Sequence, residues 1–248
     1  MPTQKVRLDQ LLLARGLVES REKAQRAIMA GDVTVCERVI DKPGTRVALD
    51  ATVTLREHER YVSRGGRKLE AALQAFSPPV TGAICLDIGA STGGFTDCLL
   101  QHGAAKVYAI DVGHSQMAWK IRADPRVIVR EKINARYLDP RDFRDPIDLC
   151  VIDVSFISLT LILRPAFELL RCGGMLIALI KPQFELSRES ISKGGIVRDP
   201  LLHDQAVAKI RAFVEEALHQ TWSGCITSPI LGAEGNKEFL ACLRAASA

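Results

Sequence analysis

The sequence has few aromatic residues and no long hydrophobic run. Phenylalanine, tryptophan and tyrosine together make up 5% of its 248 residues, so we expect a core of aliphatic side chains. No uninterrupted apolar stretch reaches the roughly 18 residues that a membrane-spanning helix needs. The first residues also lack the apolar segment of a signal peptide. We therefore expect a cytoplasmic protein that has no membrane partner.

Cysteines are scattered along the chain, and no two of the seven have the spacing of a metal-binding pair. In a chain without a secretion signal, such a set predicts reduced and mostly buried thiols. The sequence therefore argues against a zinc site and against a disulfide framework, and we expect no metal cofactor.

Positive charge is concentrated in the first quarter of the chain. Residues 1–68 contain 14 lysines and arginines against 9 acidic residues, whereas residues 69–248 contain 19 against 20. A basic segment beside a neutral body is typical of a nucleic-acid-binding module joined to another domain. A solvated basic surface explains the same numbers, so charge alone leaves both interpretations open.

The N-terminal segment predicts two short helices followed by short strands. Apolar residues at helical spacing follow Arg7, and Gly16 is placed to end that helix. Ser20 is a suitable N-cap for a second helix, which Gly31 closes. Short β-rich pieces follow at 33–35, near residue 47 and at 53–55, with a Lys-Pro-Gly turn between the first two.

This segment resembles the S4-type RNA-binding domain over roughly residues 5–56. The resemblance rests on the order Arg-Leu-Asp, Ser-Arg, Ala, Ile, Gly-x-Val and Lys-Pro-Gly. It implies a small α+β domain whose helix-borne arginines contact phosphates and read the shape of RNA. Cys36-Glu37 stands where that family usually has Asn-Gly, so we expect a differently built turn there. The candidates for RNA contact in this domain are Arg7, Arg15, Arg21, Lys23 and Arg26.

Residues 60–68 are basic, broken by glycine, and lead into a predicted helix. We expect one domain over residues 1–60 and a second over 61–248, with 61–67 as the interdomain linker. Arg64 and Arg67 are in a position to line the path of RNA between the domains, and we add them to the RNA-binding candidates.

From about residue 83, apolar runs alternate with amphipathic stretches. Strands that alternate with helices predict parallel βαβ units and a doubly wound, mostly parallel sheet, that is, an α/β Rossmann-like fold. The predicted strands are 83–88, 106–110, 127–130, 149–153, 175–180, 225–230 and 239–243. The predicted helices include 95–101, 159–171 and 203–217.

A glycine-rich loop follows the first of these strands, in the sequence Asp-Ile-Gly-Ala-Ser-Thr-Gly-Gly at 87–94. Small residues there allow a tight turn and a close approach of a ligand to a helix N-terminus. Asp111 ends the second strand, 22 residues after Gly89. An acid at that place accepts hydrogen bonds from a ribose. This order predicts a site for a nucleoside cofactor.

The loop favours S-adenosylmethionine over NAD as the cofactor. Its spacing, Gly-x-Ser-x-Gly-Gly, differs from the Gly-x-Gly-x-x-Gly of dinucleotide binders. The acid before the loop suits a cationic methionine end and would repel a pyrophosphate. We expect Asn134, after the third strand, to lie near the adenine, and turn capping is its alternative role. The candidates for cofactor binding are Asp87, Gly89, Ser91, Gly93, Gly94, Asp111 and Asn134.

The same loop fits the Gly-x-Ser-x-Gly nucleophile elbow of α/β-hydrolases, with Asp153 and His203 later in the chain. However, the elbow of a hydrolase does not follow the first strand of its domain. His203 falls on a predicted amphipathic helix, where we expect a histidine at the surface. A hydrolase is therefore the weaker interpretation.

Two later strand ends carry Asp-Val-Ser-Phe-Ile-Ser at 153–158 and Lys-Pro-Gln-Phe-Glu at 181–185. With Ser-Arg-Gly-Gly-Arg-Lys-Leu at 63–69, the glycine loop, and Gly-Asn-Lys-Glu-Phe at 235–239, they resemble the TlyA (hemolysin-A-like) family over nearly the whole chain. That family joins an S4-type module to an FtsJ-like class I methyltransferase domain. The resemblance implies 2′-O-methylation of cytidine in ribosomal RNA, with a catalytic tetrad of Lys68, Asp153, Lys181 and Glu238.

The chemistry of the tetrad has two versions that the sequence leaves open. Lys181 is the candidate base for the ribose hydroxyl, which requires a lysine that is partly neutral. Alternatively, the two carboxylates position the lysines, and Lys181 only orients the hydroxyl. The alternative functions are an RNA- or ribosome-binding protein without turnover, against which the intact tetrad argues, and a membrane-lytic protein.

Overall fold

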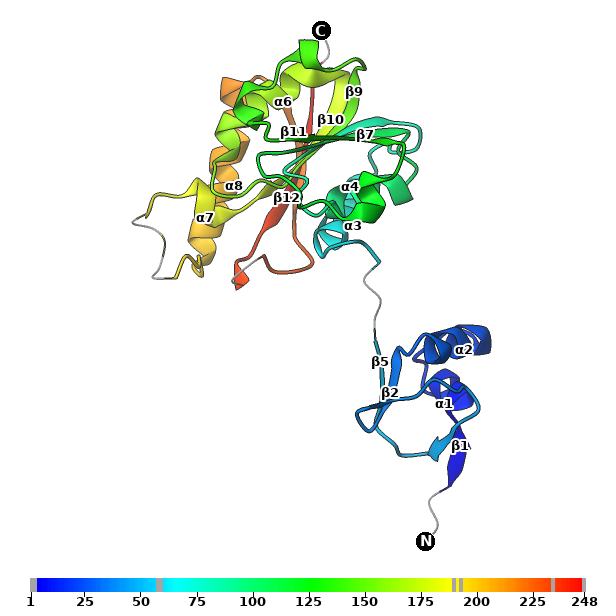
Figure 1. Cartoon of the computed structure of the whole chain (residues 1–248). Coiled ribbons are helices and arrows are strands. Elements are labelled where there is room, and N and C mark those ends of the chain that lie inside the picture. The colour runs from blue at the N-terminus through cyan, green and yellow to red at the C-terminus, as the bar shows by residue number, and fades with distance from the viewer. Residues whose placement is uncertain (1–3, 57–59, 189–190, 192–193, 233–234, 247–248) are drawn as a thin grey trace. The chain divides into compact units, whose positions relative to one another are not determined.

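The computed structural model describes residues 4–56, 60–188, 191, 194–232 and 235–246. The chain divides into two compact units, residues 1–59 and residues 60–248 (Figure 1). The predicted division, between residues 60 and 61, is one residue further along the chain.

The first unit packs two helices and short strands around an aliphatic core. α1 (Leu8–Ala14) and α2 (Arg21–Met29) contact each other. Their ends follow the predicted signals, because Gly16 has a φ of +67° and the Ser20 hydroxyl accepts a hydrogen bond of 3.2 Å from the Lys23 N–H. The buried core consists of Leu8, Leu11, Leu12, Ala24, Ile28, Val33 and Val47.

The strands of the first unit form two small antiparallel sheets. β1 (Lys5–Arg7) pairs with β4 (Arg46–Ala48), and β2 (Val33–Val35) lies between β3 (Arg38–Val39) and β5 (Val53–Leu55). The sequence analysis predicted neither β1 nor β3. Both are only two or three residues long, too short for an alternating pattern to show.

The turn between β2 and β3 corrects one expectation. Cys36 and Glu37 have φ values of 47° and 65°. Both residues therefore adopt the left-handed conformation that a two-residue hairpin turn of the Asn-Gly type requires. The substitution of Asn-Gly changes the residues of this turn but not its backbone.

The second unit is built on a seven-stranded sheet in the order β11-β12-β10-β9-β6-β7-β8. Its strands are β6 (Ile84–Ile88), β7 (Lys106–Asp111), β8 (Val127–Glu131), β9 (Ile147–Ile152), β10 (Leu170–Ile180), β11 (Thr221–Thr227) and β12 (Phe239–Arg244). The five strands from β10 to β8 run parallel, and β12 pairs antiparallel with both β10 and β11. This confirms the predicted doubly wound, mostly parallel sheet.

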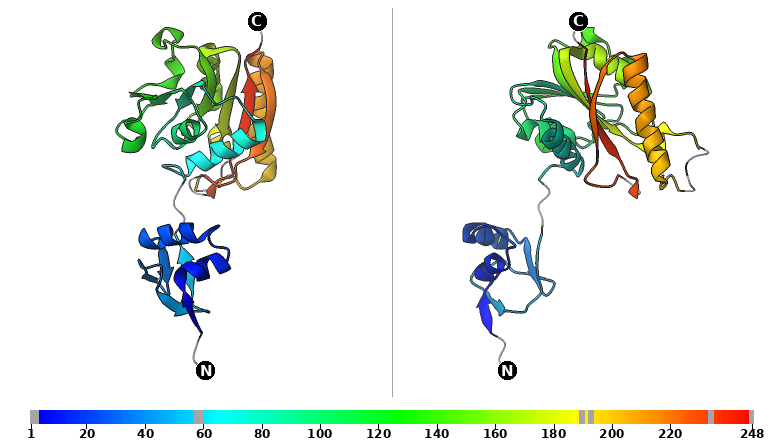
Figure 2. Two further views of the ribbon diagram at one scale, coloured as in Figure 1. Left: turned by 90° about the vertical axis from the view of Figure 1, so that its right-hand side faces the viewer. Right: turned by 180° about the vertical axis from the view of Figure 1, so that it is seen from behind.

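Helices cover both faces of this sheet (Figures 1 and 2). α3 (Gly65–Phe76) and α4 (Gly94–Gln101) pack on one face, in a core that includes Leu69 and Leu99. α6 (Leu163–Leu169) and α8 (Pro200–Ala212) pack on the other face, in a second core. The short helices are α5 (Trp119–Arg122), α7 (Pro182–Glu185), η1 (Ala135–Tyr137), η2 (Pro140–Asp142), η3 (Leu159–Leu161) and the π-helical turn η5 (Phe213–Ala217).

Several predicted elements have different bounds in the structure. The helix predicted over 159–171 is split into η3 and α6 and ends at Leu169, because Leu170 already pairs with Ile147 of the neighbouring strand. The helix predicted from residue 203 begins at Pro200, where the Asp199 side chain caps it. The strand predicted over 225–230 runs instead over Thr221–Thr227.

Residues 61–67 pack as part of the second unit. Tyr61 is 2% exposed, and the Val62 N–H donates a hydrogen bond of 2.9 Å to the Asp97 carboxylate on α4. A Cβ at Gly66 would lie 2.2 Å from the Tyr61 ring, so only glycine lets α3 pass so close. The glycines that suggested a linker therefore serve close packing at the start of a helix.

Candidate active site

The ends of several strands meet at one edge of the sheet and position the predicted site. Gly89 follows β6, Asp153 follows β9 and Lys181 follows β10. Glu238 precedes β12, whose antiparallel register places Phe239 opposite Ile180. Glu238 and Lys181 are therefore neighbours across adjacent strands. In open α/β sheets the carboxyl ends of the parallel strands are where ligands bind.

The glycine loop comes into close contact with the end of β9. Gly89 has a φ of +86°, and a Cβ there would lie 2.3 Å from the Asp153 carbonyl oxygen. Gly94, the first residue of α4, is equally constrained, because its Cβ would lie 2.2 Å from the Ser63 hydroxyl. Side chains at these two positions would push apart the segments that form the site.

Asp111 ties the end of β7 to the glycine loop. One carboxylate oxygen accepts a hydrogen bond of 2.8 Å from the Ser91 N–H, and the other accepts one of 2.7 Å from the Gly113 N–H. Each oxygen keeps a lone pair for a further donor. A carboxylate fixed in this way is suited to accept hydrogen bonds from the hydroxyl groups of a ribose.

A cavity of about 580 Å³ opens beside Asp111. This volume is in the usual range for a small-molecule site. Four of the seven predicted cofactor residues line it, namely Gly89, Ser91, Asp111 and Asn134. Its other lining residues include Val112, Gln116, Ile133, Arg136, Asp153, Ser155 and Phe156.

A second cavity of about 350 Å³ lies on the other side of the same loop. It is lined by Lys68 and Gly94 and by residues 63–65 at the start of α3. Gly89, Ser91 and Asp153 line both cavities. Asp153 therefore lies where the cavity beside Asp111 adjoins the cavity beside Lys68.

Asp87 and Gly93 line neither cavity. Asp87 is fully buried, and one of its oxygens accepts a hydrogen bond of 2.6 Å from the Thr96 hydroxyl. The other oxygen has no hydrogen-bond partner among the described residues. Burial raises the pKa of Asp87 from its ordinary value of 3.8 to about 7. This carboxyl group lies beneath the loop, where a cationic ligand or an ordered water would satisfy it.

Lys181 forms an ion pair with Asp153. The Lys181 Nζ lies 2.6 Å from Asp153 Oδ1 and donates a hydrogen bond of 2.9 Å to the Ser155 hydroxyl. The lysine side chain is 10% exposed and the aspartate side chain 22% exposed. An ammonium group has three N–H donors, so one donor remains for a ligand in the cavity that Asp153 and Ser155 line.

Lys68 forms the second ion pair of the tetrad, with Glu238. Their Nζ and Oε2 atoms are 2.5 Å apart, and the side chains are 10% and 2% exposed. A Cβ at Gly232 would lie 2.1 Å from Glu238 Oε1, so this glycine makes room for the carboxylate. The structure therefore brings the predicted tetrad together as two lysine–carboxylate pairs.

A further carboxylate holds the segment that carries Asp153 and Ser155. Glu185 is 5% exposed and accepts hydrogen bonds of 2.6 Å from the Ser158 hydroxyl and 2.8 Å from the Leu159 N–H. The rings of Phe156 and Phe184 pack with their centroids 5.1 Å apart. The two strand-end motifs thus contact each other near both of their ends, through Lys181 and through Glu185.

Two alternatives from the sequence can now be assessed. Asn134 caps η1, because its side chain accepts a hydrogen bond of 3.1 Å from the Arg136 N–H, and it also lines the larger cavity. His203 is buried and its ring bonds to the Val197 carbonyl, so the expectation of a surface histidine is wrong. The Ser91 hydroxyl bonds to Gln116, and these contacts do not form a hydrolase triad.

The RNA-binding candidates of the first unit are held in different ways. Arg7 and Arg21 both pair with the buried Asp9. Arg15 donates to the carbonyl groups of Leu49 and Ala51, which ties α1 to the end of β4. Lys23 pairs with Glu19, and Arg26 is exposed on α2. In the second unit Arg64 lines the smaller cavity, and Arg67 is exposed on α3.

Some residues of the site were not singled out from the sequence. Ser63 and Phe95 lay within or next to recognised motifs but were given no role, and Gln116 lines the larger cavity only because of how distant segments pack. Gly232 adjoins Glu238 across a loop, and no local pattern marks it. Ser155 was within a recognised motif, and its spacing of two from Asp153 on the same side of an extended segment could have indicated a shared role.

The described part of the chain offers neither a metal site nor a membrane-spanning helix. No group of three or more histidine, cysteine, aspartate or glutamate side chains is arranged there to hold a metal ion. None of the described helices has both the length and the apolar character to cross a membrane. Four of the seven cysteines are buried, as Cys85, Cys98, Cys150 and Cys242.

Comparison with known proteins identifies the family. Residues 61–245 match the family model of FtsJ-like methyltransferases, and residues 6–53 match that of the S4 domain. The chain is 43% identical over 244 residues to the 16S/23S rRNA (cytidine-2′-O)-methyltransferase TlyA of Mycobacterium tuberculosis, covering 97% of this chain and 90% of that protein. It is 44% identical to hemolysin A of Brachyspira hyodysenteriae, covering 95% of this chain and 98% of that protein.

Solved structures agree with this assignment. A structure from Streptococcus thermophilus superposes with a TM-score of 0.74 at 46% identity, covering 98% of this chain and 90% of that chain. An O-methyltransferase from Bacillus cereus superposes with a TM-score of 0.52 at 19% identity, covering 74% of this chain and 82% of that chain, which shows the fold alone. The protein therefore belongs to the FtsJ-like methyltransferases, in the TlyA group that carries an S4 domain ahead of the catalytic domain.

Proposed function

We propose that this protein transfers a methyl group from S-adenosylmethionine to the 2′-hydroxyl of a cytidine in ribosomal RNA. The observation that carries the proposal is the pair of cavities that share Gly89, Ser91 and Asp153. A nucleoside site beside Asp111 thereby adjoins a space that Lys68 faces. The relative in Mycobacterium tuberculosis is named for the same reaction on 16S and 23S rRNA.

The residues present fit S-adenosylmethionine. Asp111 would accept the ribose hydroxyls, and Asn134 would lie near the adenine. Asp87 lines neither cavity, so it would act on the cationic methionine end only through the loop, as a buried acidic group beneath it. When bound, this cofactor supplies an electrophilic methyl group on a sulfonium, which an oxygen takes by in-line displacement.

Lys181 is the residue to which we assign the acceptor hydroxyl. Two of its N–H groups have acceptors in Asp153 and Ser155. The third would donate to the 2′-oxygen and hold one of its lone pairs toward the methyl donor. This arrangement favours the orienting role over proton abstraction by the lysine, so the hydroxyl proton would pass to water as the oxygen–methyl bond forms and the sulfur–methyl bond breaks. The Lys68–Glu238 pair fixes a second cation at the edge of the smaller cavity.

The S4 domain is the proposed docking element. Its arginines would contact phosphates of the folded RNA, which gives affinity without reading a sequence. Ribosomal RNA, naked or within a subunit, is therefore the expected partner, and the reaction would take place in the cytoplasm. The Campylobacter jejuni relative is named for 23S rRNA alone, whereas the mycobacterial name covers both RNAs, so the subunit must be measured.

The test is methyl transfer from labelled S-adenosylmethionine to 30S subunits, 50S subunits and naked ribosomal RNA. We expect label in at least one of them, at the ribose 2′-oxygen of a cytidine. The phosphodiester bond that follows this cytidine should then resist alkaline cleavage. Lys181→Ala serves as the inactive control. A protein that binds RNA but labels no substrate would be an RNA-binding protein without turnover, and the proposal would be wrong.

A further inference from the structure

We propose that Asp9, which is buried in the first unit, is a positioning residue for RNA docking. It would act by holding the guanidinium groups of Arg7 and Arg21 in one fixed arrangement at the surface. The inference rests on the proposed function, because it takes RNA as the ligand of these arginines.

The Asp9 carboxylate is at the centre of a hydrogen-bond network. Oδ1 accepts from Arg7 Nε at 3.0 Å and from the Gln10 N–H at 3.0 Å. Oδ2 accepts from Arg7 Nη2 at 3.0 Å, from Arg21 Nε at 3.0 Å and from Gln25 Nε2 at 3.3 Å. The hydrogen bonds from Arg7, with those from Arg21 and Gln25, hold the pKa of Asp9 well below its usual range.

The two arginines remain available to a ligand. Their side chains are 40% and 51% exposed, whereas that of Asp9 is 0% exposed. Arg7 uses Nε and one N–H of Nη2, so both N–H groups of Nη1 are left over from this network. Arg21 uses only Nε, which leaves its terminal fork. A guanidinium group that is already hydrogen-bonded to Asp9 presents its remaining N–H donors in fixed directions, which suits phosphate oxygens.

Packing fixes Arg7 from another side. A Cβ at Gly44 would lie 3.4 to 3.6 Å from three atoms of the Arg7 guanidinium, so that group lies against the Lys-Pro-Gly turn. The turn is itself bound to the start of α1, since the Asp9 N–H donates to the Pro43 carbonyl at 3.2 Å. Arg7 and Arg21 therefore meet at the Asp9 carboxylate, and the Lys-Pro-Gly turn is bound to the backbone of the same residue.

This arrangement has an energetic consequence for binding. A free arginine loses side-chain entropy when it is fixed on a phosphate, and a residue that fixes it beforehand removes part of that cost. On the other hand, Asp9 subtracts one unit of charge from a surface that is to bind a polyanion. Charge alone predicts that neutralising Asp9 strengthens RNA binding. Positioning predicts that it weakens RNA binding.

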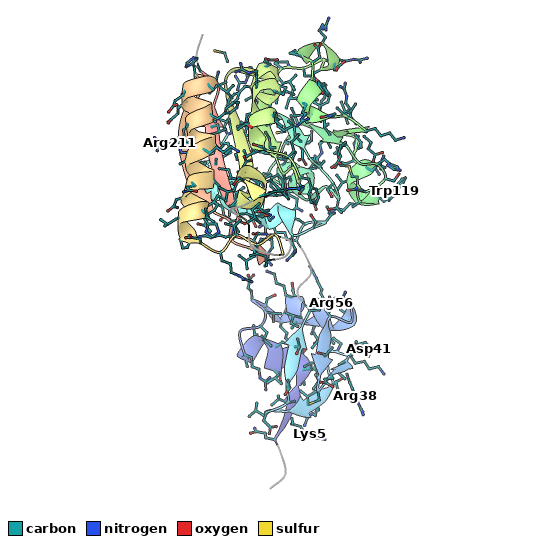
Figure 3. The ribbon with its side chains drawn as sticks, turned by 90° about the vertical axis from the view of Figure 1, so that its left-hand side faces the viewer. Lys5, Arg38, Asp41, Arg56, Trp119 and Arg211 are labelled. Atoms are coloured by element: carbon teal, nitrogen blue, oxygen red, sulfur yellow. The ribbon has the colours of Figure 1, made fainter. Side chains whose placement is uncertain are left out.

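The experiment uses this difference in sign. Full-length Asp9→Asn is compared with wild type in binding to fluorescent fragments of ribosomal RNA over a series of salt concentrations. We expect affinity to fall roughly tenfold and the salt slope to fall by about 1. The matched control is Asp41→Asn, an exposed acid of the same unit (Figure 3). It adds the same charge, and we expect unchanged or tighter binding.

A cycle with Arg21→Gln separates positioning from a general effect on folding. If Asp9 acts through the arginines, Asp9→Asn costs less affinity in the Arg21→Gln background than in wild type. Equal costs in both backgrounds, or binding by Asp9→Asn at least as tight as wild type, would overturn the inference.

Three further outcomes bear on this inference. If Asp9→Asn does not fold, Arg21→Lys takes its place, because lysine keeps the charge but lacks the fork; undiminished binding by that variant rejects the inference. If the wild-type protein methylates RNA and the Asp9→Asn variant binds RNA normally, only this inference is contradicted. Wild-type protein without affinity for ribosomal RNA contradicts the proposed function as well.

Discussion

In the first unit Arg7 and Arg21 keep 40% and 51% of their side chains exposed, whereas Lys68 and Lys181 in the second unit keep 10%. Arg7, Arg21 and Lys68 each pair with a carboxylate that is more buried than the cation, whereas Asp153 is more exposed than its partner Lys181, at 22% against 10%. The arginines extend outward from their carboxylate toward solvent. Lys68 lines the smaller cavity, and Lys181 pairs with Asp153, which lines both cavities.

This difference follows from what each set has to contact. Phosphates on a large RNA are reached from outside, so long side chains with several donors serve best there. A single hydroxyl that must be aligned with a methyl donor needs one point-like donor whose position is fixed by ion pairing and burial. If RNA docking and methyl transfer are separate tasks of the two units, substitutions in one unit should leave the task of the other unit intact.

The largest effect is expected for Lys181→Ala. It removes the donor that we assign to the 2′-oxygen and leaves Asp153 without its cation, so the rate of methyl transfer should fall by about 10² to 10⁴. Cofactor binding and RNA binding should persist. The measurement is single-turnover transfer together with calorimetric titration of S-adenosylmethionine.

The matched control for that variant is Lys106→Ala. Lys106 also lies 2.6 Å from a carboxylate, that of Asp145, but it begins β7 and so lies at the end of that strand opposite to Asp111. We expect nearly wild-type turnover from it. Transfer by Lys181→Ala at the rate of the control would remove Lys181 from the mechanism.

Glu238→Gln is expected to act on stability and on turnover together. It leaves the buried Lys68 without a carboxylate, which should cost roughly 3 kcal/mol of unfolding free energy. Denaturant unfolding measures this. Replacing both partners, as Lys68→Met with Glu238→Leu, should restore much of the stability but none of the activity. An active double variant would show that the pair is structural only.

Reversing charge at Arg21 and Arg26 to glutamate should weaken RNA binding by about a hundredfold while cofactor affinity stays intact. The control makes the same two reversals at Arg38 and Arg56, elsewhere on the first unit (Figure 3). A larger loss in the control than in the helix variant would place the docking face on the strands, not on α2.

The smallest effect is expected for Asp87→Asn, as a shift in thermal stability. The folded pKa of Asp87, about 7, lies above its ordinary value of 3.8. Its stabilising contribution is therefore complete below pH 4 and is lost as pH rises toward 7. The variant should gain a few degrees in Tm relative to wild type at pH 8 and little at pH 4. A difference in Tm that does not change with pH would contradict the assigned burial.

Cofactor affinity of the same variant tests the role of Asp87. If its unpartnered oxygen serves the methionine end, Asp87→Asn should bind S-adenosylmethionine more weakly at pH 8 even though it is more stable. If the affinity for S-adenosylmethionine is unchanged, Asp87 has a structural role and takes no part in cofactor binding. Arg21 and Arg26 variants should show neither effect, because they lie in the other unit.

Sequence reasoning predicted the sheet well because its strands are buried on both faces and appear as continuous apolar runs. It was least accurate where tertiary pairing competes with local preference. Leu170 has the pattern of a helix residue, but it pairs with Ile147 and becomes the first residue of β10. His203 has the spacing of a surface residue, but the Val197 carbonyl satisfies it inside the fold.

The candidate site was predictable in its residue types but not in its pairing. The glycine loop, Asp111 and the tetrad were found from motifs. That Lys181 pairs with Asp153, and Lys68 with Glu238, depends on which strands are neighbours. Gly232 makes room for the Glu238 carboxylate through a contact that no local pattern indicates, whereas the spacing of Ser155 from Asp153 could have indicated its contact with Lys181.

By itself, the sequence determined the order of helices and strands, the basic character of the first unit and the chemical groups available for catalysis. These properties depend on residue type and on the spacing of residues that are close together in the sequence. Only the tertiary structure decided which charges face solvent, which carboxylate each cation contacts, and that residues 61–67 pack against α4. Those outcomes depend on distances between segments up to 170 residues apart, because burial and ion pairing are properties of the folded chain as a whole.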